Sequence, residues 1–297
     1  MKISSVIKNV IVTILVIGIF GYMFYRLYHE WGNLAEYNLQ FNYLYLILSI
    51  IVFIFFYFLE GLGYYIFVRL INADAPFLKV LKSRYISDMG RYVPGKIWTV
   101  LWRLYFLKGY SITKLQIIVS SLIEMAMMCL GSLLMFLLTL LFWDARLQPW
   151  MYVVFLLIPA VFIAIHPKVL NWSINVIERI RGKEEVKIRT SYGRMLGTTL
   201  FYLFYWMVYG LGSFLLISSI TPIGWELFPM ITGVFAITWL LGFVSFLAPG
   251  GLGVRDGLLV YFLIFIFPEP IAIIITLVTR LQISVIEGVY ALVSLKF

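Results

Sequence analysis

The sequence has little charge, one cysteine and two histidines. Only 12% of its 297 residues are charged, whereas 63% are hydrophobic and the mean hydropathy is +0.98. Soluble domains are typically about 45–50% apolar and about 25% charged, so this composition excludes an ordinary soluble fold and indicates an integral membrane protein. The single cysteine, Cys129, excludes a disulfide framework and a Cys-rich metal site.

Motifs of soluble enzymes are also missing. The sequence contains no H-E-x-x-H, no G-x-S-x-G and no G-x-x-x-x-G-K-[ST]. His29 and His166 are far apart and lie near the ends of apolar runs, so we interpret both as interfacial residues. We therefore expect no metal site, no cofactor and no built-in ATPase.

Long apolar runs follow one another along the chain. A spanning helix needs roughly 20 apolar residues, and open sheet edges are not tolerated in hydrocarbon, so we predict an all-α, polytopic bundle. The first run lacks a small-x-small cleavage site and is expected to remain as an uncleaved helix. About eight spans are predicted, near residues 6–25, 43–69, 115–141, 150–166, 195–219, 229–247, 254–267 and 271–295. Since the seventh run is short and the fourth contains Pro159, the count could change by one.

Lysine and arginine lie mainly on one side of this predicted topology. The loops on the other side contain only Arg26 and Arg146, together with several acidic residues. By the positive-inside rule, both termini are predicted to be cytoplasmic in a multi-pass protein of the cell membrane. The net charge of +9 is explained in this way and does not require a nucleic-acid partner.

The longest polar segment, residues 167–194, separates two similar halves. Apolar residues recur there at helical spacing, which favours a surface-lying amphipathic helix over a plain basic loop. We treat 1–297 as a single domain with possible halves 1–166 and 195–297. Each half has two apolar runs, a Pro-Gly motif and two further runs, a layout that predicts an internal repeat with broken helices near the repeat interface.

The first Pro-Gly motif is YVPGKIW, at residues 92–98. Proline suits the first position of a helix, and a helix N-terminus favours phosphate through its unbonded N–H groups and partial positive charge. The motif is therefore predicted to be a phosphate-recognising re-entrant helix at the cytoplasmic leaflet. The alternative is a surface helix with ordinary Lys, Arg and Trp anchors. Its candidate ligands for a lipid phosphate are Arg91, Pro94, Gly95, Lys96 and Arg103.

The second Pro-Gly motif is APGGLGVRDG, at residues 248–257. Its glycines permit an unwound backbone whose polar groups can line a cavity within the membrane. The alternative is a tight cytoplasmic turn before the seventh run. The candidate ligands in this motif are Gly250, Gly251, Gly253 and Arg255, followed by Asp256 as a cavity carboxylate.

Several further charges lie inside the apolar runs. Each would cost about 2.5–3.5 kcal/mol at the bilayer centre, so such residues usually face a wet cavity or a partner. They predict a polar cavity within the bundle, the alternative being structural ion pairs between helices. The candidate cavity carboxylates are Glu60, Asp88, Glu124, Asp256 and Glu287, and Arg280 is a further candidate for the phosphate.

The ordered pair GRYVPGKIWTVLWR and APGGLGVRDG resembles the motifs of the lysylphosphatidylglycerol synthase transmembrane-region family, whose members are flippase-like. In its best-known members this membrane unit is fused to a soluble aminoacyltransferase, and it moves the aminoacylated phosphatidylglycerol to the outer leaflet. Other relatives accompany glycosyltransferases that act on polyprenyl-linked sugars. Residues 91 and 94–96 match the first family motif, and residues 249–251, 253, 255 and 256 match the second.

The resemblance implies a lipid flippase that moves a phosphate-containing lipid, either an aminoacylated phosphatidylglycerol or a polyprenyl phosphosugar. Because the chain stops soon after its last apolar run, only the lipid-translocating half of the family's activity is expected, and we do not expect an enzyme. One alternative is a membrane partner of a separate soluble aminoacyltransferase or glycosyltransferase. Another is a membrane-embedded transferase with Asp88, Glu124 or Asp256 as its acid or base. The expected partners are membrane lipids, such a soluble enzyme and a second copy of the chain.

Overall fold

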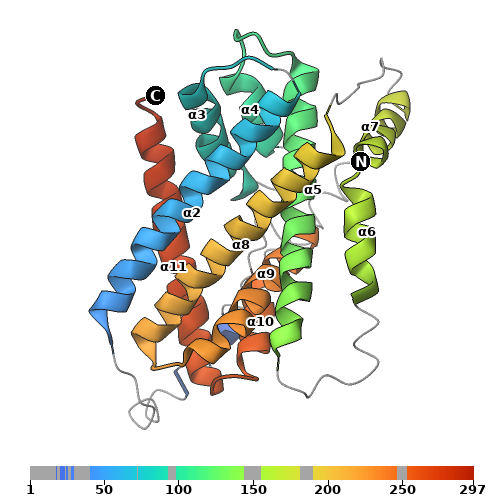
Figure 1. The fold of residues 1–297 in the computed structure, drawn as a ribbon. Coiled ribbons are helices and arrows are strands. Elements are labelled where there is room, and N and C mark those ends of the chain that lie inside the picture. Colours follow the sequence, from blue (N-terminus) through green and yellow to red (C-terminus); the bar gives the residue numbers. More distant parts are fainter. Residues whose placement is uncertain are drawn as a thin grey trace.

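The computed structural model describes residues 41–71, 73–92, 98–143, 155–180, 190–245 and 253–297, together with residues 18, 21–23, 25 and 28–29. These residues form helices and turns without a β-strand, apart from one isolated bridge between Asp74 and Ser111 (Figure 1). The prediction of an all-α bundle is therefore confirmed for the described part of the chain.

Within the described ranges, five helices are long and apolar enough to cross a membrane. They are α2 (Tyr43–Leu70), α5 (Lys114–Thr139) with its extension η3 (Leu140–Phe142), α8 (Tyr192–Ile220), α9 (Phe228–Val244) with the preceding turn η5 (Trp225–Leu227), and α11 (Glu269–Ser294). The protein is therefore a multi-pass membrane protein.

Local sequence signals begin most of these helices. The Asn42 side chain accepts a hydrogen bond from the Leu44 amide at the start of α2 (3.0 Å). Thr113 and Gln116 form a reciprocal capping box at the start of α5, and Ser191 caps α8. Proline occupies the first turn of α9 and α11. The backbone N–H that proline lacks would have no partner within the helix at this position, so proline is tolerated there.

Two helical hairpins complete the bundle. Hairpin 1 consists of α3 (Phe77–Asp88), η2 (Met89–Tyr92) and α4 (Trp98–Phe106), and hairpin 2 consists of α9 and α10 (Val254–Leu263). In Figure 1, α2 runs upward, hairpin 1 descends from the upper end, and α5 runs downward. In the second half, α8 runs downward, hairpin 2 rises from the lower end, and α11 runs upward.

The packing of the two halves follows the same pattern. The helices α2 and α8 lie against each other at the centre of the bundle. The contact of α2 with α3 matches that of α8 with α9, the contact of α4 with α5 matches that of α10 with α11, and the contact of α3 with α11 matches that of α9 with α5. The bundle is therefore an inverted repeat, in which each half has the same arrangement with opposite direction.

One predicted span differs from the structure, and two others lie partly outside the described residues. The run at 254–267 forms α10, which has 10 residues and ends at Leu263. At a rise of about 1.5 Å per residue it is too short to cross a membrane, so the prediction of a span there is wrong. At 150–166 the described part is α6 (Leu157–Ala164), followed by α7 (Pro167–Ile180), and neither is among the five long helices. The predicted span 6–25 lies mostly outside the described residues.

An aromatic core joins α2 to α8. The Phe56 ring stacks on Tyr205 with centroids 4.4 Å apart and packs on Tyr209 at 4.8 Å. Trp206 is completely buried, and its indole N–H donates to the carbonyl of Met128 in α5 at 3.1 Å. Each aromatic pair contributes about 0.5–1.5 kcal/mol beyond its area. Such contacts matter here because lipid tails are as apolar as the helices and do not drive them together.

A glycine brings the two arms of each hairpin together next to the turn. A β-carbon on Gly90 would lie 2.9 Å from the amide nitrogen of Thr99, and one on Gly242 would lie 2.6 Å from the β-carbon of Arg255. Real side chains do not tolerate contacts this short, so both turns depend on glycine for their close approach.

The substitution Gly242→Ala therefore tests the turn of hairpin 2. We expect it to destabilise the protein by about 1–3 kcal/mol, because the added methyl group overpacks the contact with Arg255. The matched control is Gly193→Ala in α8, where a β-carbon would meet nothing within 4 Å and where alanine favours the helix by about 0.5–1 kcal/mol. Thermal unfolding in detergent measures both, and equal midpoints for the two variants would contradict this packing.

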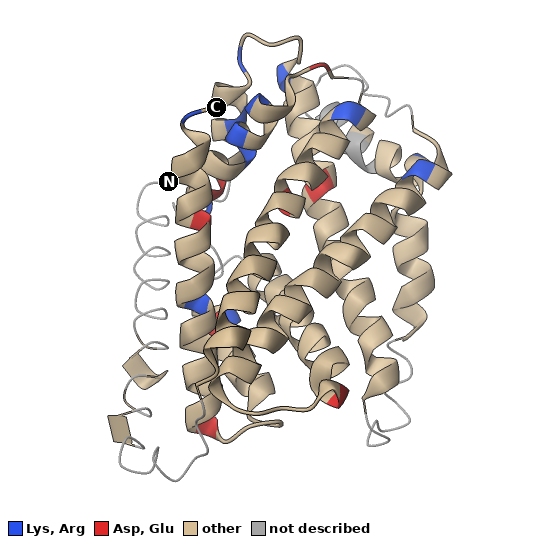
Figure 2. Cartoon of the chain, turned by 60° about the vertical axis from the view of Figure 1, so that its left-hand side comes forward, with Lys and Arg blue, Asp and Glu red and all other residues tan. Residues whose placement is uncertain are grey.

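Figure 2 shows how charge is distributed over the bundle. Most of the lysine and arginine lies toward the end of the bundle that contains the C-terminus, while acidic residues mark the opposite end. Charged residues of both signs also lie inside the bundle. This interior group defines the candidate site.

Candidate functional site

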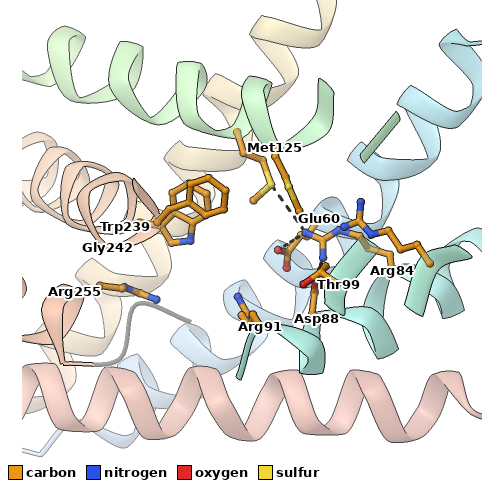
Figure 3. Close-up of a pocket in the computed structure, with 12 residues that line it drawn as sticks. Glu60, Arg84, Asp88, Arg91, Thr99, Met125, Trp239, Gly242 and Arg255 are labelled. Atoms are coloured by element: carbon orange, nitrogen blue, oxygen red, sulfur yellow. Dashed lines mark hydrogen bonds and ion pairs between the residues drawn. The ribbon is translucent and has the colours of Figure 1, made fainter. Parts of the chain in front are cut away.

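A pocket lies between the ends of the two hairpins. Its cavity volume is about 130 Å³, which is smaller than the ~300–1,000 Å³ of typical small-molecule sites. Figure 3 shows hairpin 1 on one side of the pocket and hairpin 2 on the other, with α5 across the top of the view and α11 along the bottom. Its lining residues are Glu60, Arg84, Asp88, Arg91, Thr99, Arg103, Met125, Met128, Trp239, Gly242, Phe243 and Arg255.

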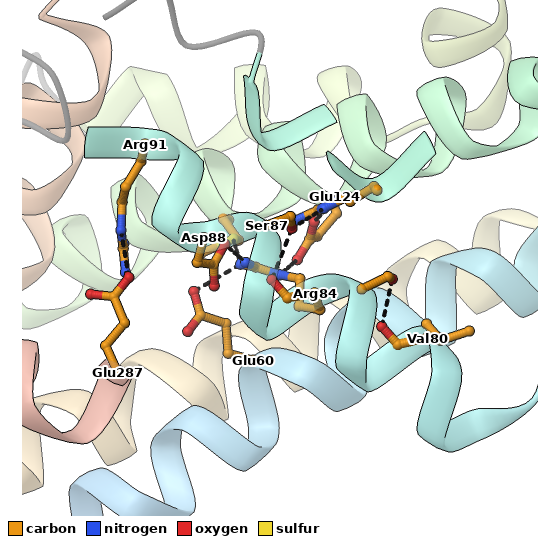
Figure 4. Close-up of polar contacts among 11 residues, drawn as sticks. Glu60, Val80, Arg84, Ser87, Asp88, Arg91, Glu124 and Glu287 are labelled. Carbon is orange, nitrogen blue, oxygen red and sulfur yellow. Dashed lines mark hydrogen bonds and ion pairs between the residues drawn. The ribbon is translucent and has the colours of Figure 1, made fainter. Parts of the chain in front are cut away.

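Arg84 is the centre of the ion pairs on the hairpin 1 side. Its Nη2 lies 2.8 Å from Oε1 of Glu60 in α2, its Nε lies 2.7 Å from Oε1 of Glu124 in α5, and its Nη1 pairs with Asp88 one turn along α3 (Figure 4). All four side chains are at least nine-tenths buried. One guanidinium therefore joins three helices through three carboxylates.

Opposing effects act on the charge of Arg84. Burial lowers the pKa of its guanidinium, but the nearby Glu124 and Glu60 carboxylates raise it, so that the pKa lies above its ordinary value. Arg84 therefore remains positively charged. Loss of this charge would leave the carboxylates that it contacts with less compensation for their burial.

Arg103 of α4 is the second cation of this group. Its Nη1 donates to Oε2 of Glu124 at 2.6 Å and its Nε donates to Oγ of Ser87 at 3.2 Å. Its guanidinium also lies 4.1 Å from the centre of the Tyr64 ring, within the range of a cation–π contact. Arg103 is 1% exposed, so its position is set by contacts inside the bundle.

Arg91 links the turn of hairpin 1 to α11. Its Nε lies 2.9 Å from Oε1 of Glu287, and its Nη2 pairs with the same oxygen. In Figure 4 the two side chains point toward each other across the gap between η2 and α11. A second contact ties α3 of hairpin 1 to the residues just after α11, because the Lys82 Nζ donates to the backbone oxygen of Phe297 at 2.9 Å.

The end of hairpin 2 begins with Gly253 in a left-handed conformation (φ +77°), which a glycine adopts without strain. Its amide donates to Oδ2 of Asp256 at 3.1 Å, which caps α10. The other oxygen of Asp256 lies 3.9 Å from Nη1 of Arg280 in α11. Thus α11 contacts both hairpins by ion pairs of opposite polarity, through Glu287 and Arg280.

Arg255 differs from the other arginines of the site. It is 9% exposed and lines the pocket, and its Nη2 donates to the hydroxyl of Tyr209. No carboxylate among the described residues forms an ion pair with it. Since a buried guanidinium without a counter-ion is costly, the geometry suits an anion in the pocket next to Arg255, bound by charge-assisted hydrogen bonds.

The structure brings together many of the residues that the sequence singled out. Glu60, Asp88, Arg91, Arg103 and Arg255 line one pocket. Behind it, Glu124, Glu287, Asp256 and Arg280 are their partners or hold the hairpins in place. Gly253 forms the turn, whereas Pro94, Gly95, Lys96, Gly250 and Gly251 lie outside the described residues.

Sequence reasoning missed Arg84, Tyr209 and Trp239. The structure buries Arg84 and Arg103 inside the bundle and places Arg91 at the pocket. The reason for missing Arg84 is that α3 and α4 are too short and too polar to read as membrane helices, and their charges are neutralised by distant residues. The one local signal was the spacing of Arg84 and Asp88, four residues apart, which puts both on one face of a helix.

Comparison with known proteins places this fold in a family. No curated protein and no solved structure matches the chain. A family model described as the lysylphosphatidylglycerol synthase TM region matches residues 8–286, a range that includes both hairpins, the residues that line the pocket and the first part of α11. The chain therefore belongs to the lysylphosphatidylglycerol synthase transmembrane-region family.

Proposed function

We propose that the protein is a flippase that moves a phosphate-containing polar lipid between the leaflets of the cell membrane. The observation that carries this proposal is the buried Arg255, which faces the pocket and has no carboxylate partner among the described residues. Arg91 approaches the same pocket from the opposite hairpin (Figure 3). A phosphate between the two guanidinium groups would receive charge-assisted, bidentate hydrogen bonds.

The fold supports movement of the lipid from one leaflet to the other. The pocket lies where two hairpins meet that enter from opposite ends of the bundle. Inverted repeats with a site at the repeat interface suit alternating access, since rocking one half against the other opens the site to each side in turn. The headgroup would occupy the pocket while the tails remain in the hydrocarbon.

Two lipid classes fit this proposal because both contain a phosphate. They are an aminoacylated phosphatidylglycerol, which the name of the family suggests, and a polyprenyl phosphosugar. In the proposed orientation both termini are cytoplasmic and hairpin 1 enters from the cytoplasmic side.

The arrangement of carboxylates favours transport over catalysis. A membrane transferase would need a positioned acid or base, and Asp88, Glu124 and Asp256 are the candidates. Asp88 and Glu124 each pair with an arginine, and Asp256 caps α10 beside Arg280. These contacts give Glu124 and Asp256 a structural role, while Asp88 is held by Arg84 through one of its two oxygens.

Lipid movement in vesicles tests the proposal. The purified protein is reconstituted into liposomes that contain a fluorescent phosphatidylglycerol, a lysyl-phosphatidylglycerol or a polyprenyl phosphosugar, and the appearance of each in the outer leaflet is followed by dithionite quenching. We expect at least one of these lipids to cross faster than in protein-free vesicles. The matched control is a labelled diacylglycerol with an uncharged sugar headgroup, for which no acceleration is expected. Equal rates with and without protein for every phosphate-containing lipid would refute the flippase.

A further inference from the structure

Among the residues that the structure describes, the charges around the pocket balance as a whole but not locally. Five arginines (Arg84, Arg91, Arg103, Arg255 and Arg280) face five carboxylates (Glu60, Asp88, Glu124, Asp256 and Glu287) in these ranges. On the hairpin 1 side, three carboxylates share Arg84 and Arg103, which leaves one negative charge in excess. Around the hairpin turns, three arginines face Asp256 and Glu287, which leaves one positive charge in excess.

Asp88 is the least satisfied member of the negative group. Its Oδ1 pairs with Arg84, but its Oδ2 is buried without a hydrogen-bond partner among the described residues. By contrast, both oxygens of Glu124 are bound, one by Arg84 and the other by Arg103. A buried carboxylate oxygen without a donor is costly when ionised, whereas the protonated form turns that oxygen into a donor.

The groups around Asp88 determine when it would take up a proton. The cations of the pocket are Arg84 on its own helix, Arg91 in η2, Arg103 in α4 and Arg255 in α10. The carboxylates around it are Glu60 from α2, Glu124 from α5 and Glu287 from α11. In the empty pocket the positive groups favour an ionised Asp88. An anion bound to Arg91 and Arg255 weakens the positive potential of these two arginines at Asp88. Its negative charge also repels the ionised carboxylate, so the protonated form of Asp88 is favoured.

We propose that Asp88 is a proton-binding site and that the protein takes up one proton together with one lipid phosphodiester. This inference deepens the proposed function and rests on it. The monoanionic phosphodiester brings one negative charge and the proton brings one positive charge, so the total charge of the described residues and their ligands is the same in the occupied site as in the empty one. The proton adds to the buried Asp88 Oδ2, no covalent bond of the lipid changes, and the neutral carboxyl no longer repels the phosphate. A transmembrane proton gradient would then drive the lipid in one direction.

Calorimetry on the full chain tests this inference. The protein is placed in nanodiscs of zwitterionic lipid and titrated with dihexanoyl-phosphatidylglycerol, a phosphodiester that keeps a single charge throughout the range. We expect the affinity to rise as the pH is lowered from about 8 to about 6, by up to tenfold for each pH unit. Titrations in two buffers with different heats of ionisation should show about one proton taken up for each lipid bound.

Two substitutions locate the proton. Asp88→Asn should bind with an affinity that no longer depends on pH and should take up no proton, while Asp88→Glu should keep both properties. The matched control is Asp74→Asn, whose side chain is 84% exposed and which should behave like the wild type. If Asp88→Asn does not fold, the proton uptake of the wild-type protein still decides whether a proton binds with the lipid.

The outcomes separate this inference from the proposed function. A wild-type protein that does not bind the phosphodiester at any pH overturns both. Binding that is independent of pH and releases or takes up no proton overturns proton coupling but leaves the anion site intact. Binding that depends on sodium concentration at constant pH, without proton uptake, overturns the proton in favour of a metal cation. An unchanged pH dependence in Asp88→Asn refutes Asp88 as the site.

Discussion

Replacing Arg255 with glutamine should reduce lipid movement about 10- to 100-fold while the protein remains folded. The range corresponds to the loss of about 1.5–3 kcal/mol from hydrogen bonds to a charged group. The fold should tolerate the change because Arg255 has no carboxylate partner among the described residues, so its removal does not strand a buried negative charge. Glutamine retains a donor for the hydroxyl of Tyr209.

The dithionite assay measures the rate of lipid movement, and thermal unfolding in detergent measures stability. We expect the midpoint of Arg255→Gln to equal or exceed that of the wild type, because a costly buried charge is removed. Arg69→Gln is the matched control, since Arg69 is half exposed and pairs with Asp74 at 2.7 Å on the surface. If Arg255→Gln moves lipid as fast as this control, Arg255 does not bind the lipid phosphate.

The opposite result is expected when Arg84 is replaced with glutamine. This change should lower the free energy of unfolding by about 3–5 kcal/mol, the range found when one partner of a buried ion pair is removed. Glu60 and Asp88 would lose their ion-pair partner, and Glu124 would keep only Arg103. Arg84→Lys should recover only part of the stability, since an ammonium group cannot reproduce the fork of three contacts.

Thermal unfolding and yield from the membrane measure this effect, again with Arg69→Gln as the control. A second substitution sharpens the test. Adding Glu60→Gln to Arg84→Gln removes one stranded carboxylate, so the double variant should be more stable than the sum of the two single changes predicts. Strict additivity, or a midpoint for Arg84→Gln equal to that of the control, would show that these ion pairs do not hold the three helices together.

The long helices could be predicted from the sequence because each has its own signal. Runs of about 20 apolar residues identify membrane helices without knowledge of the neighbours, and α2, α5, α8, α9 and α11 all fall on predicted spans. The Pro-Gly motifs also indicated broken helices. The hairpins were not predictable in this way. The run at 254–267 was predicted to be a span because it is apolar, but its helix α10 has only 10 residues.

The candidate site was only partly accessible to sequence reasoning. Glu60, Glu124 and Glu287 stood out because a charge within an apolar run is rare. Arg84 did not stand out, because α3 is a polar segment in which an arginine appears ordinary. Its importance comes from Glu60 and Glu124, which lie 24 and 40 residues away in sequence. A pairing across such distances depends on the fold, and no local pattern contains it.

The inverted repeat has a consequence for the ancestry of the chain. Because α2, hairpin 1 and α5 have the same arrangement as α8, hairpin 2 and α11 turned upside down, one half-length polypeptide inserted in both orientations could pair with itself through the surfaces that α2 and α8 now share. Gene duplication and fusion would then fix one orientation for each copy. Fusion would also free the copies to differ, as the described residues of the halves do: Glu60, Asp88 and Glu124 gather at hairpin 1, whereas Arg255 in hairpin 2 has no carboxylate partner among them.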